Sequence, residues 1–179
     1  MTSPERAGER ELIRLAQQGD TQAFGQLVVR HQQVVFNIAY RMVGNRQEAE
    51  DVAQESFIKT YQTLDRFDRE RPFAPWLYRI TTNTALNWIK RRRPEAELEE
   101  ETLHVGTMAS PEAQTIAIEA SERLRMAIAA LPPNYRAAIE LRHFQGLSYQ
   151  EMSEVLGVPL SDVKSWLFRA RRRLREVLT

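Results

Sequence analysis

The sequence predicts an all-α protein that consists of two small helical domains joined by a flexible acidic linker. Apolar residues recur at helical spacing along most of the 179 residues, whereas alternating strand patterns are hard to find. The 7 glycines and 8 prolines are grouped, so they separate long uninterrupted segments. Residues 94–111 are rich in glutamate and contain few large apolar side chains, which is typical of a linker.

We expect the first domain to occupy residues 1–93. Thr21 can cap its second helix, and Gly44 can end that helix because glycine readily adopts the left-handed conformation. The segment 65–75 holds two prolines and several charges, which favours a loop, and Pro94 stops the helix that follows. Four helices are therefore expected, at about residues 9–18, 21–44, 46–64 and 75–92.

The second domain is expected to occupy residues 112–179. Its first helical segment is interrupted by two consecutive prolines in 131–134, resumes to about Phe144 and turns at 145–147. Two more helices should follow, and the Gly-Val-Pro sequence at 157–159 separates them.

These two helices have the pattern of a helix-turn-helix. Ser148 and Glu151 can form a capping box, in which each side chain satisfies a backbone amide at the helix start. Gly157 suits the left-handed end of that helix, and Ser161 can cap the next one. A motif of this kind places its second helix in the major groove of DNA.

The last helix has two different faces. Its core face is expected to pack on the domain and consists of Val163, Leu167, Ala170, Leu174 and Val177. Its outer face is expected to bind DNA and consists of Ser161, Lys164, Ser165, Phe168, Arg169 and Arg172. The alternative is a helical hairpin with a solvated basic face. Phe168 weighs against that alternative, because an aromatic side chain there has no core to fill but can contact a thymine methyl.

The third helix of the first domain carries a face that folding does not explain. Its core stripe is expected to consist of Ala49, Val52, Ala53, Phe57, Tyr61 and Leu64. A separate polar face with an embedded isoleucine consists of Asp51, Gln54, Glu55 and Ile58. Such a face suits docking on a partner protein, although a lone exposed isoleucine is also ordinary on protein surfaces.

The fourth helix likewise has a second face. Large apolar side chains at helical spacing predict a buried stripe of Phe73, Trp76, Leu77, Ile80, Thr84 and Trp88. Basic and amide side chains that suit phosphates and bases predict an exposed stripe. That stripe consists of Arg79, Thr82, Asn83, Leu86, Lys90 and Arg93.

Charge is unevenly distributed, although the formal net charge is only +1. The run 90–93 is basic, the stretch 169–175 is rich in arginine, and a glutamate-rich stretch at 95–101 lies between them. Separate basic patches predict two surfaces that face polyanions, with ordinary solvated charge as the alternative.

Composition and motifs argue against several other classes of function. The chain has no cysteine, which excludes disulfides and thiolate chemistry, and its 3 histidines lack ligand spacing, so we expect no metal and no cofactor. No nucleophile–base set or phosphate loop is recognisable, so we expect neither enzymatic activity nor a small-molecule substrate. Because no apolar run reaches membrane-spanning length and the N-terminus lacks a signal-peptide pattern, we expect a cytoplasmic protein.

Three parts of the chain also carry motifs of one protein family. The sequence DVAQESFIK occupies residues 51–59 and PWLYRITTNTA occupies 75–85, while LPP at 131–133 precedes the helix-turn-helix stretch 148–173. In this order the motifs resemble those of the extracytoplasmic-function (ECF) sigma factors of the sigma-70 family, and the resemblance covers nearly the whole chain.

The resemblance implies that the protein binds core RNA polymerase and directs promoter-specific transcription initiation. The third-helix face would bind the clamp helices of the beta-prime subunit, and the second domain would also touch the beta flap. The fourth-helix stripe would read the promoter −10 element, and the loop 65–75 with Asn83 would hold a base flipped out of the melted strand. The last helix would read the −35 duplex. The linker would thread toward the active-site channel, and an anti-sigma factor would hold the protein inactive.

Some residues depart from the family pattern, and two other hypotheses compete. The loop 66–71 varies between family members, so it does not predict which base is preferred. Trp166 is at a position that is often polar, and it is expected to pack on the core or to touch the DNA backbone. A conventional helix-turn-helix regulator would need a ligand pocket or dimer face in the first domain. A helical enzyme would need grouped histidines or carboxylates in a cleft.

Overall fold

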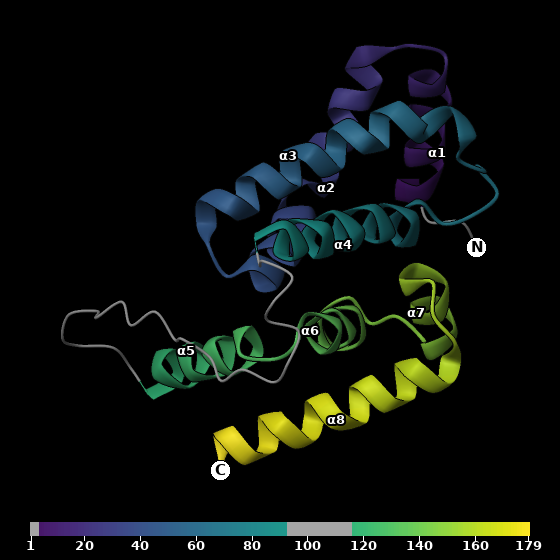
Figure 1. Ribbon diagram of the computed structural model, residues 1–179. Helices are drawn as coiled ribbons and strands as arrows, with labels where there is room; N and C mark the ends of the chain where they lie inside the picture. The colour runs from purple at the N-terminus through teal and green to yellow at the C-terminus, as the bar shows by residue number, and fades with distance from the viewer. Residues whose placement is uncertain (1–3, 93–115) are drawn as a thin grey trace.

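The computed structural model describes residues 4–92 and 116–179, and within these segments it contains helices and no strands (Figure 1). The all-α prediction is therefore confirmed. Arg93 and the expected linker 94–111 lie outside the described residues. Within the described segments, no helix combines the length and the apolar character that crossing a lipid bilayer requires.

The N-terminal half, residues 4–92, contains four α-helices. They are α1 (Pro4–Gln17), α2 (Thr21–Val43), α3 (Arg46–Thr63) and α4 (Phe73–Arg92), with a short 3-10 turn, η1 (Leu64–Arg66), after α3. Helix α2 packs against the other three, and α3 also packs on α4. The predicted helices are confirmed, but α1 begins earlier than expected and α4 begins inside the predicted loop 65–75.

Capping explains where α2 begins and ends. Asp20 accepts hydrogen bonds from the backbone amides of Gln22 and Ala23 at 3.0 and 3.1 Å. The prediction that Thr21 caps this helix is therefore wrong, because the Asp20 carboxylate satisfies these amides and suits the positive end of the helix. Gly44 ends the helix with a φ of 76°, as predicted.

The buried side of α3 differs from the predicted stripe. Two polar residues, Ser56 and Thr60, are fully buried there, and each hydroxyl donates to the backbone carbonyl one turn earlier at 2.7 Å. These internal hydrogen bonds allow polar side chains inside the core. Part of the predicted stripe therefore lies nearer the surface, and Tyr61, which was expected to be buried, is 43% exposed.

The C-terminal half, residues 116–179, contains the remaining helices. They are α5 (Ile116–Ala129), α6 (Pro133–Ile139), η3 (Glu140–Phe144), α7 (Tyr149–Leu156) and α8 (Leu160–Leu178). The proline pair breaks the chain before α6 as predicted, and Pro133 takes the first helical position, where its missing amide costs nothing. The segment η3 is a π-helical turn, in which the Gln145 amide donates to the Glu140 carbonyl at 3.1 Å.

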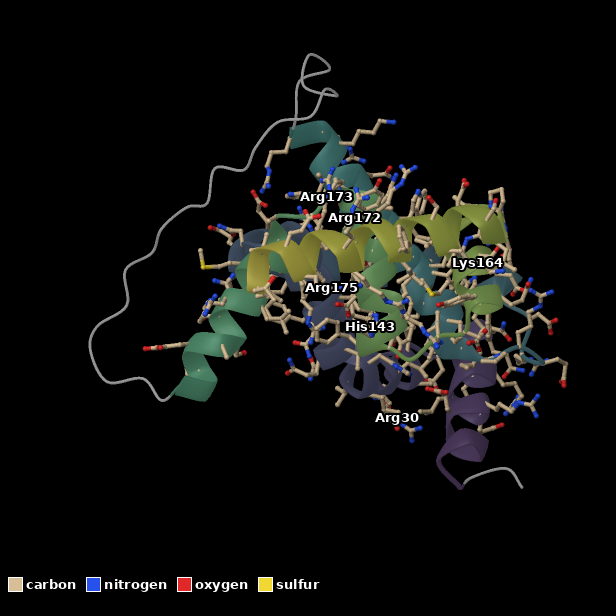
Figure 2. All side chains as sticks on the ribbon, turned by 90° about the horizontal axis from the view of Figure 1, so that it is seen from below. Arg30, His143, Lys164, Arg172, Arg173 and Arg175 are labelled. Carbon is tan, nitrogen blue, oxygen red and sulfur yellow. The ribbon has the colours of Figure 1, made fainter. Side chains whose placement is uncertain are left out.

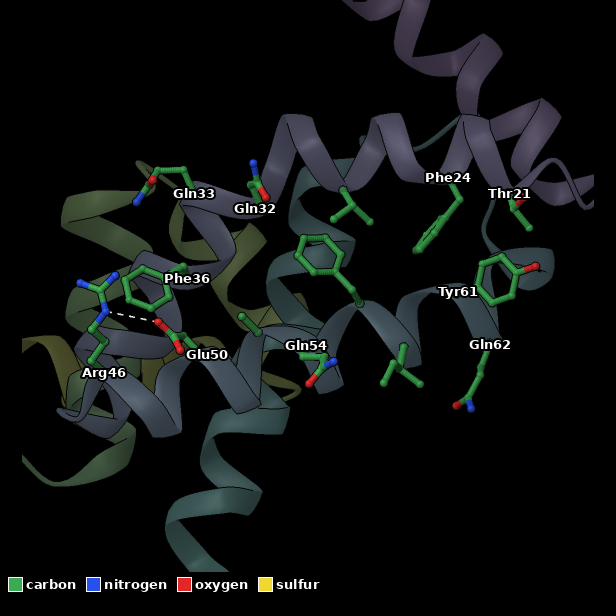
Figure 3. Close-up of a pocket in the computed structure, with 14 residues that line it drawn as sticks. Thr21, Phe24, Gln32, Gln33, Phe36, Arg46, Glu50, Gln54, Tyr61 and Gln62 are labelled. Atoms are coloured by element: carbon green, nitrogen blue, oxygen red, sulfur yellow. Dashed lines mark hydrogen bonds and ion pairs between the residues drawn. The ribbon is translucent and has the colours of Figure 1, made fainter.

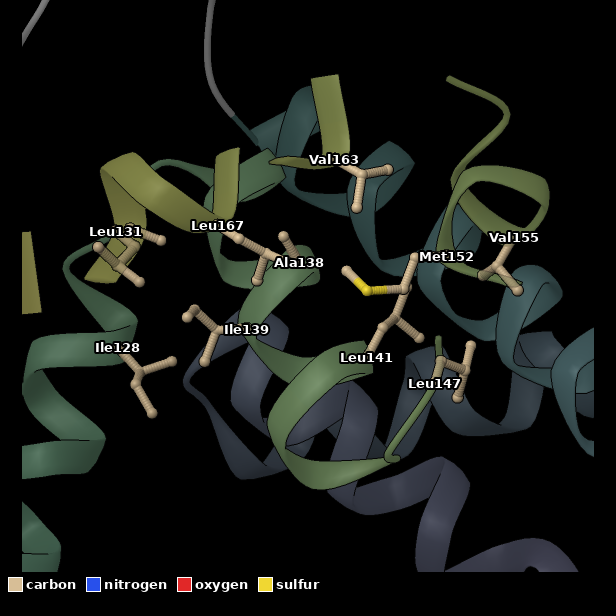
Figure 4. Close-up of a cluster of buried hydrophobic side chains, with 11 residues drawn as sticks. Ile128, Leu131, Ala138, Ile139, Leu141, Leu147, Met152, Val155, Val163 and Leu167 are labelled. Atoms are coloured by element: carbon tan, nitrogen blue, oxygen red, sulfur yellow. The ribbon is translucent and has the colours of Figure 1, made fainter. Parts of the chain in front are cut away.

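All of these C-terminal elements contribute to one hydrophobic core (Figure 4). The core consists of Ile128, Leu131, Ala138, Ile139, Leu141, Leu147, Met152, Val155, Val163, Leu167 and Ala170. Helix α8 supplies the last three of these residues, so it is held by one side only. Trp166 and Leu174 pack partly against the same core.

The two halves pack against each other. Helix α4 contacts α6 and α7, and α2 contacts α5 and α6 (Figure 1). Ala137 of α6 is fully buried in a cluster whose other buried members come from the N-terminal half, and Tyr78 of α4 packs against the cores of both halves. Helix α8 lies on the side of the C-terminal half that faces away from α4.

Candidate nucleic-acid interface

The outer face of α8 is open to solvent. Ser161, Lys164, Phe168, Arg169 and Arg172 are exposed as predicted, and Ser165 is half-buried. Figure 2 shows Lys164 and Arg172 on the α8 ribbon, in a view onto this side of the C-terminal half. The opposite side is buried through Val163, Leu167 and Ala170, but the predicted stripe ends there: Leu174 is half-buried and Val177 is 60% exposed.

Aromatic and histidine side chains position several of the arginines of α8. Arg169 donates to the hydroxyl of Tyr135 at 3.3 Å, and the guanidinium of Arg173 lies over the ring of the same tyrosine, 5.6 Å from its centroid. Arg171 donates to His143 at 3.3 Å. Burial, followed by the charges of Arg171 and Arg142, lowers the pKa of His143, which favours the neutral imidazole that can accept that bond.

The turn before α8 is fixed by local hydrogen bonds. The Glu151 amide donates to Ser148 Oγ at 3.1 Å, and the Ser148 amide donates to the Glu151 carboxylate at 2.7 Å, which confirms the predicted capping box. Gly157 ends α7 with a φ of 66°. The prediction that Ser161 caps α8 is wrong, because the helix begins at Leu160, directly after Pro159, without a side-chain cap.

The predicted stripe of α4 is only partly exposed. Arg79, Asn83 and Lys90 are exposed and recur about every one or two turns, so they lie on one side of the helix. Leu86 is half-buried. Thr82 is only 1% exposed, and its hydroxyl has no hydrogen-bond partner in the described structure. The expectation that Thr82 is exposed is therefore wrong.

The reason is that α4 has two buried sides. One side packs on α2 and α3, and the other packs on α6 and α7 of the C-terminal half. Thr82 lies one turn from both Tyr78 and Leu86, which pack against the cluster that includes Ala137 of α6. The second contact joins residues far apart in sequence, so helical periodicity alone did not predict it.

The segment before α4 is more ordered than the predicted loop. The side-chain amide of Gln17 donates to the carbonyls of Leu64 and Phe67, each at 2.9 Å, and ties this segment to α1. The rings of Phe67, Phe73 and Trp76 pack together with centroids 4.7 to 5.8 Å apart. The charged residues 68–71 remain exposed at one end of α4.

A groove of about 1080 Å³ runs between α2 and α3 (Figure 3). Its apolar lining comes from Phe24, Val28 and Phe36 of α2 and from Ala53, Phe57, Ile58 and Tyr61 of α3. Ile58 is 51% exposed, which is high for so large an apolar side chain. An exposed apolar groove with a polar rim is typical of a surface that receives a partner protein.

The structure separates the four predicted docking residues of α3. Gln54 and Ile58 line the groove, and Asp51 is exposed outside its lining. Glu55 is half-buried and forms an ion pair with Lys59 at 2.8 Å. Phe24, Val28 and Phe36 were missed by the sequence analysis. Helical periodicity places them on α2, but only the packing angle between α2 and α3 shows that they face a groove instead of a core.

Comparison with known proteins decides the family. Family models for sigma-70 region 2 and sigma-70 region 4 match residues 27–95 and 121–174. The chain is 36% identical over 176 residues to the ECF RNA polymerase sigma factor SigW of Bacillus subtilis (strain 168), and the alignment covers 93% of this chain and 94% of that protein. The chain belongs to the ECF family of RNA polymerase sigma factors.

Other relatives give the same result for this sigma factor. It is 37% identical over 180 residues to the RNA polymerase sigma-H factor of Pseudomonas aeruginosa, with 95% of this chain and 93% of that protein covered. It is 36% identical over 180 residues to the ECF RNA polymerase sigma-E factor of Escherichia coli (strain K12), with coverages of 95% and 94%. The family predicted from the sequence is therefore confirmed.

Solved sigma-factor structures share this fold. The structure of CnrH in complex with the cytosolic domain of CnrY matches with a TM-score of 0.70 and 29% identity, over 96% of this chain and 97% of that one. The sigma factor RpoE in complex with the anti-sigma factor NepR, from Bartonella quintana, matches with a TM-score of 0.69 and 22% identity, over 87% and 96%. In this sigma factor, the region 2 match spans α3 and α4 with most of α2, and the region 4 match spans most of α5 through most of α8.

Proposed function

We propose that this sigma factor docks on core RNA polymerase through the α2–α3 groove and reads promoter DNA through α4 and α8. It acts in the cytoplasm as a transcription initiation factor without an enzymatic step of its own. Residues 1–93 form the polymerase-binding and −10-reading domain, 94–111 the linker and 112–179 the −35-reading domain. The observation that carries the proposal is the combination of family membership with three separate surfaces that folding does not require.

The groove suits a helical partner. Aromatic and aliphatic side chains line it on both walls, and Gln54 and Glu50 lie on its rim. A groove with this lining accepts the apolar stripe of an amphipathic helix, while the rim fixes its register. The partner that we propose is the pair of clamp helices of the polymerase beta-prime subunit, with Asp51 as an accessible charge beside the groove. The C-terminal half would make a second contact, with the beta flap.

Helix α8 suits duplex DNA. Lys164, Arg169 and Arg172 can neutralise phosphates or donate to guanine, and Ser161 and Ser165 are near the start of the helix, where side chains reach base edges. Phe168 is 66% exposed amid these basic residues. Exposure of an aromatic ring to water is unfavourable in the free protein. Contact with a thymine methyl or the sugar backbone would bury the ring.

Helix α4 suits single-stranded DNA. Arg79 and Lys90 can bind the backbone, and Asn83 between them can hydrogen-bond a base. Arg93 would extend this stripe. The ordered segment before α4, with exposed charges at 68–71, lies at the end where a flipped −10 base would be held, and contacts there must recover the few kcal/mol that unstacking costs.

An anti-sigma factor is the partner that would switch this activity off. CnrH, which matches both halves of the chain, was solved with the cytosolic domain of CnrY bound. By analogy with that complex, we propose that a regulatory protein binds this sigma factor and keeps it from core polymerase. Co-purification of an inhibitor that lowers transcription would support this part of the proposal.

Replacing Ile58 with glutamate tests the core-docking surface. A charge placed among the groove's apolar side chains should weaken binding to core polymerase by about 2–4 kcal/mol, because Ile58 is the exposed apolar centre of the α3 wall. The affinity of each variant is measured on surface-immobilised core polymerase. Val29→Glu is the matched control, since Val29 is 67% exposed on α2 but does not line the groove. Equal effects of the two substitutions would refute the docking site.

The function as a whole is tested by transcription in vitro. Purified protein added to core polymerase should start transcription at specific sites, and Ile58→Glu should abolish those starts. If the protein instead binds duplex DNA equally well without core polymerase and starts no transcription, the protein is a conventional regulator.

A further inference from the structure

A buried ion pair joins the two halves of the chain. Arg41 of α2 donates to both carboxylate oxygens of Glu140 in η3, at 3.0 and 3.3 Å. The Glu140 side chain is 2% exposed and that of Arg41 is 26% exposed. The side-chain amide of Gln145 donates to the same carboxylate at 2.9 Å, and the Arg41 guanidinium lies 3.9 Å from the centroid of the Phe144 ring. Among the described residues, the cation that pairs with this buried carboxylate is Arg41, from the other half of the molecule.

A second arginine connects the halves at the end of α2. Arg136 of α6 is 6% exposed and donates to the backbone carbonyl of Met42, in the last turn of α2. The last carbonyls of a helix lack intrahelical partners and carry partial negative charge, so a guanidinium is a favourable partner there. Arg136 also donates to the carbonyls of Ala129 and Leu131 in its own half, at 2.7 and 2.9 Å. Arg136 is therefore held by carbonyls of the C-terminal half, while its guanidinium stabilises the end of α2 in the N-terminal half.

This closed arrangement is too short to read a promoter. The −10 and −35 elements are named for positions about 25 base pairs apart, which is about 85 Å at 3.4 Å per base pair. A compact chain of this length has a radius of gyration of about 16 Å, so its diameter is roughly half of that separation. Because α4 packs directly on α7, the two DNA-reading helices cannot reach both elements at once in this state.

We propose that Arg41, Arg136 and Glu140 form a latch that holds the free sigma factor closed on itself, without any partner, and that the latch must open before the promoter is read. This inference rests on the proposed function, because opening of the latch matters only if the protein reads both promoter elements. The latch also covers part of the −10-reading helix: Thr82 is buried with an unsatisfied hydroxyl, and opening would release it.

The charge pattern predicts which substitution opens the latch. Arg41→Met removes the cation and leaves the Glu140 carboxylate buried without it, which is the most costly arrangement for such a pair. Arg41→Met combined with Glu140→Leu removes both charges, and apolar pairs often replace buried ion pairs without loss. Arg10→Met is the control, since Arg10 pairs with Glu70 at 3.0 Å within the N-terminal half.

The latch is tested by energy transfer between dyes on the full chain. The chain lacks cysteine, so Gln26→Cys on α2 and Val177→Cys on α8, both at exposed positions, give two specific labelling sites. We expect high transfer in the parent protein and in Arg10→Met. In Arg41→Met the open form should gain on the order of tenfold in population relative to the closed form, with lower transfer and a larger radius of gyration by X-ray scattering. The double variant should return to the parent values.

Two results would overturn the latch: unchanged transfer in Arg41→Met, or a double variant that stays as open as Arg41→Met. If Arg41→Met loses helix content by circular dichroism, Arg41→Gln decides instead, since it also removes the cation but keeps a polar side chain. Lower transfer in folded Arg41→Gln supports the latch, and unchanged transfer overturns it. These measurements use no polymerase or DNA, so a failure of the proposed function would appear separately, as absent transcription with the latch intact.

Discussion

Helices α4 and α8 carry the same kinds of side chains, for which we propose DNA binding, but they differ in what covers them. Helix α8 packs on its own half by one side and leaves Lys164, Phe168 and Arg169 in solvent. Helix α4 is packed on two sides, so Arg79 and Asn83 are exposed while Thr82 is buried. The difference arises from the contact between the halves and not from either helix alone.

This difference indicates an order of events. In the closed sigma factor, the helix proposed to read the −35 element is fully presented, and the helix proposed to read the −10 element is presented only in part. Core polymerase would separate the halves when it docks on the α2–α3 groove, and α4 would then become available along its whole stripe. On this proposal, reading of the −10 element before core binding is disfavoured.

The largest effect is expected from breaking the support under α8. Leu167 is 1% exposed in the C-terminal core, so Leu167→Ala should lower the free energy of unfolding by about 2–5 kcal/mol through lost burial and a cavity. Urea denaturation followed by circular dichroism measures the change. Val177→Ala, at a 60% exposed position of the same helix, should stay within about 0.5 kcal/mol. Similar losses in both variants would show that α8 is not held by this face.

The next effect concerns the open face of α8. Lys164→Ala and Arg169→Ala should each weaken −35 duplex binding by about 1–3 kcal/mol and reduce its salt dependence, because each removes a donor to base or phosphate. Fluorescence anisotropy of a labelled duplex measures this, with Arg175→Ala as the control beyond the predicted face. Affinity for core polymerase should persist, and its loss would refute the division of labour between the halves.

A smaller effect is expected from a substitution on the buried side of α4. Thr82→Val keeps the shape of the side chain and removes a buried hydroxyl that has no hydrogen-bond partner among the described residues, so the closed protein should gain about 1 kcal/mol of unfolding free energy. Binding of −10 single-stranded DNA should weaken, because the closed form is favoured and a polar contact is lost. Thr81→Val is the matched control, since the equally buried Thr81 donates to the Leu77 carbonyl at 2.9 Å. A loss of stability in Thr82→Val would contradict the assignment.

The smallest effect should come from pH. Burial raises the pKa of Glu140 in the closed form, against the opposing effects of Gln145 and Arg41, whereas an opened Glu140 returns to its ordinary pKa. The closed form then binds more protons, so closure is favoured at pH below the ordinary value and this contribution disappears as pH rises through the raised pKa. Tyr78 also faces this carboxylate, but burial raises its own pKa further above neutrality.

Energy transfer between the two dyes, followed from neutral to mildly acidic pH, measures this contribution. Transfer should rise as pH falls, and the rise should be absent in Glu140→Gln. This control also separates Glu140 from His143 on the same π-helical turn, whose pKa is lowered by burial and by Arg171 and Arg142 of its own half. A rise of the same size in Glu140→Gln would assign the effect to another group.

Local features of the fold could be predicted from the sequence, because they depend on neighbouring residues. The Ser148–Glu151 box and the ends of α2 and α7 at Gly44 and Gly157 follow from short-range chemistry. The helix caps at Thr21 and Ser161 were predicted wrongly because a neighbouring residue starts each helix.

The surfaces were harder to predict, because they depend on contacts between distant segments. Arg41 and Glu140 are 99 residues apart in sequence, and no periodicity within either helix indicates their pairing. Burial of Thr82 has the same origin. The exposed face of α8 was predictable, since that helix has one packing side, whereas the groove required the angle between α2 and α3.

We propose above all that this chain directs core RNA polymerase to specific promoters through two separate DNA-reading helices. A genome-wide map of transcription start sites in cells that overproduce the protein tests it most directly. We expect a discrete set of new start sites that share one sequence near −35 and another near −10, and we expect these starts to be lost with Ile58→Glu and reduced with Arg169→Ala. A map without new start sites, or one that Ile58→Glu leaves unchanged, would contradict the claim.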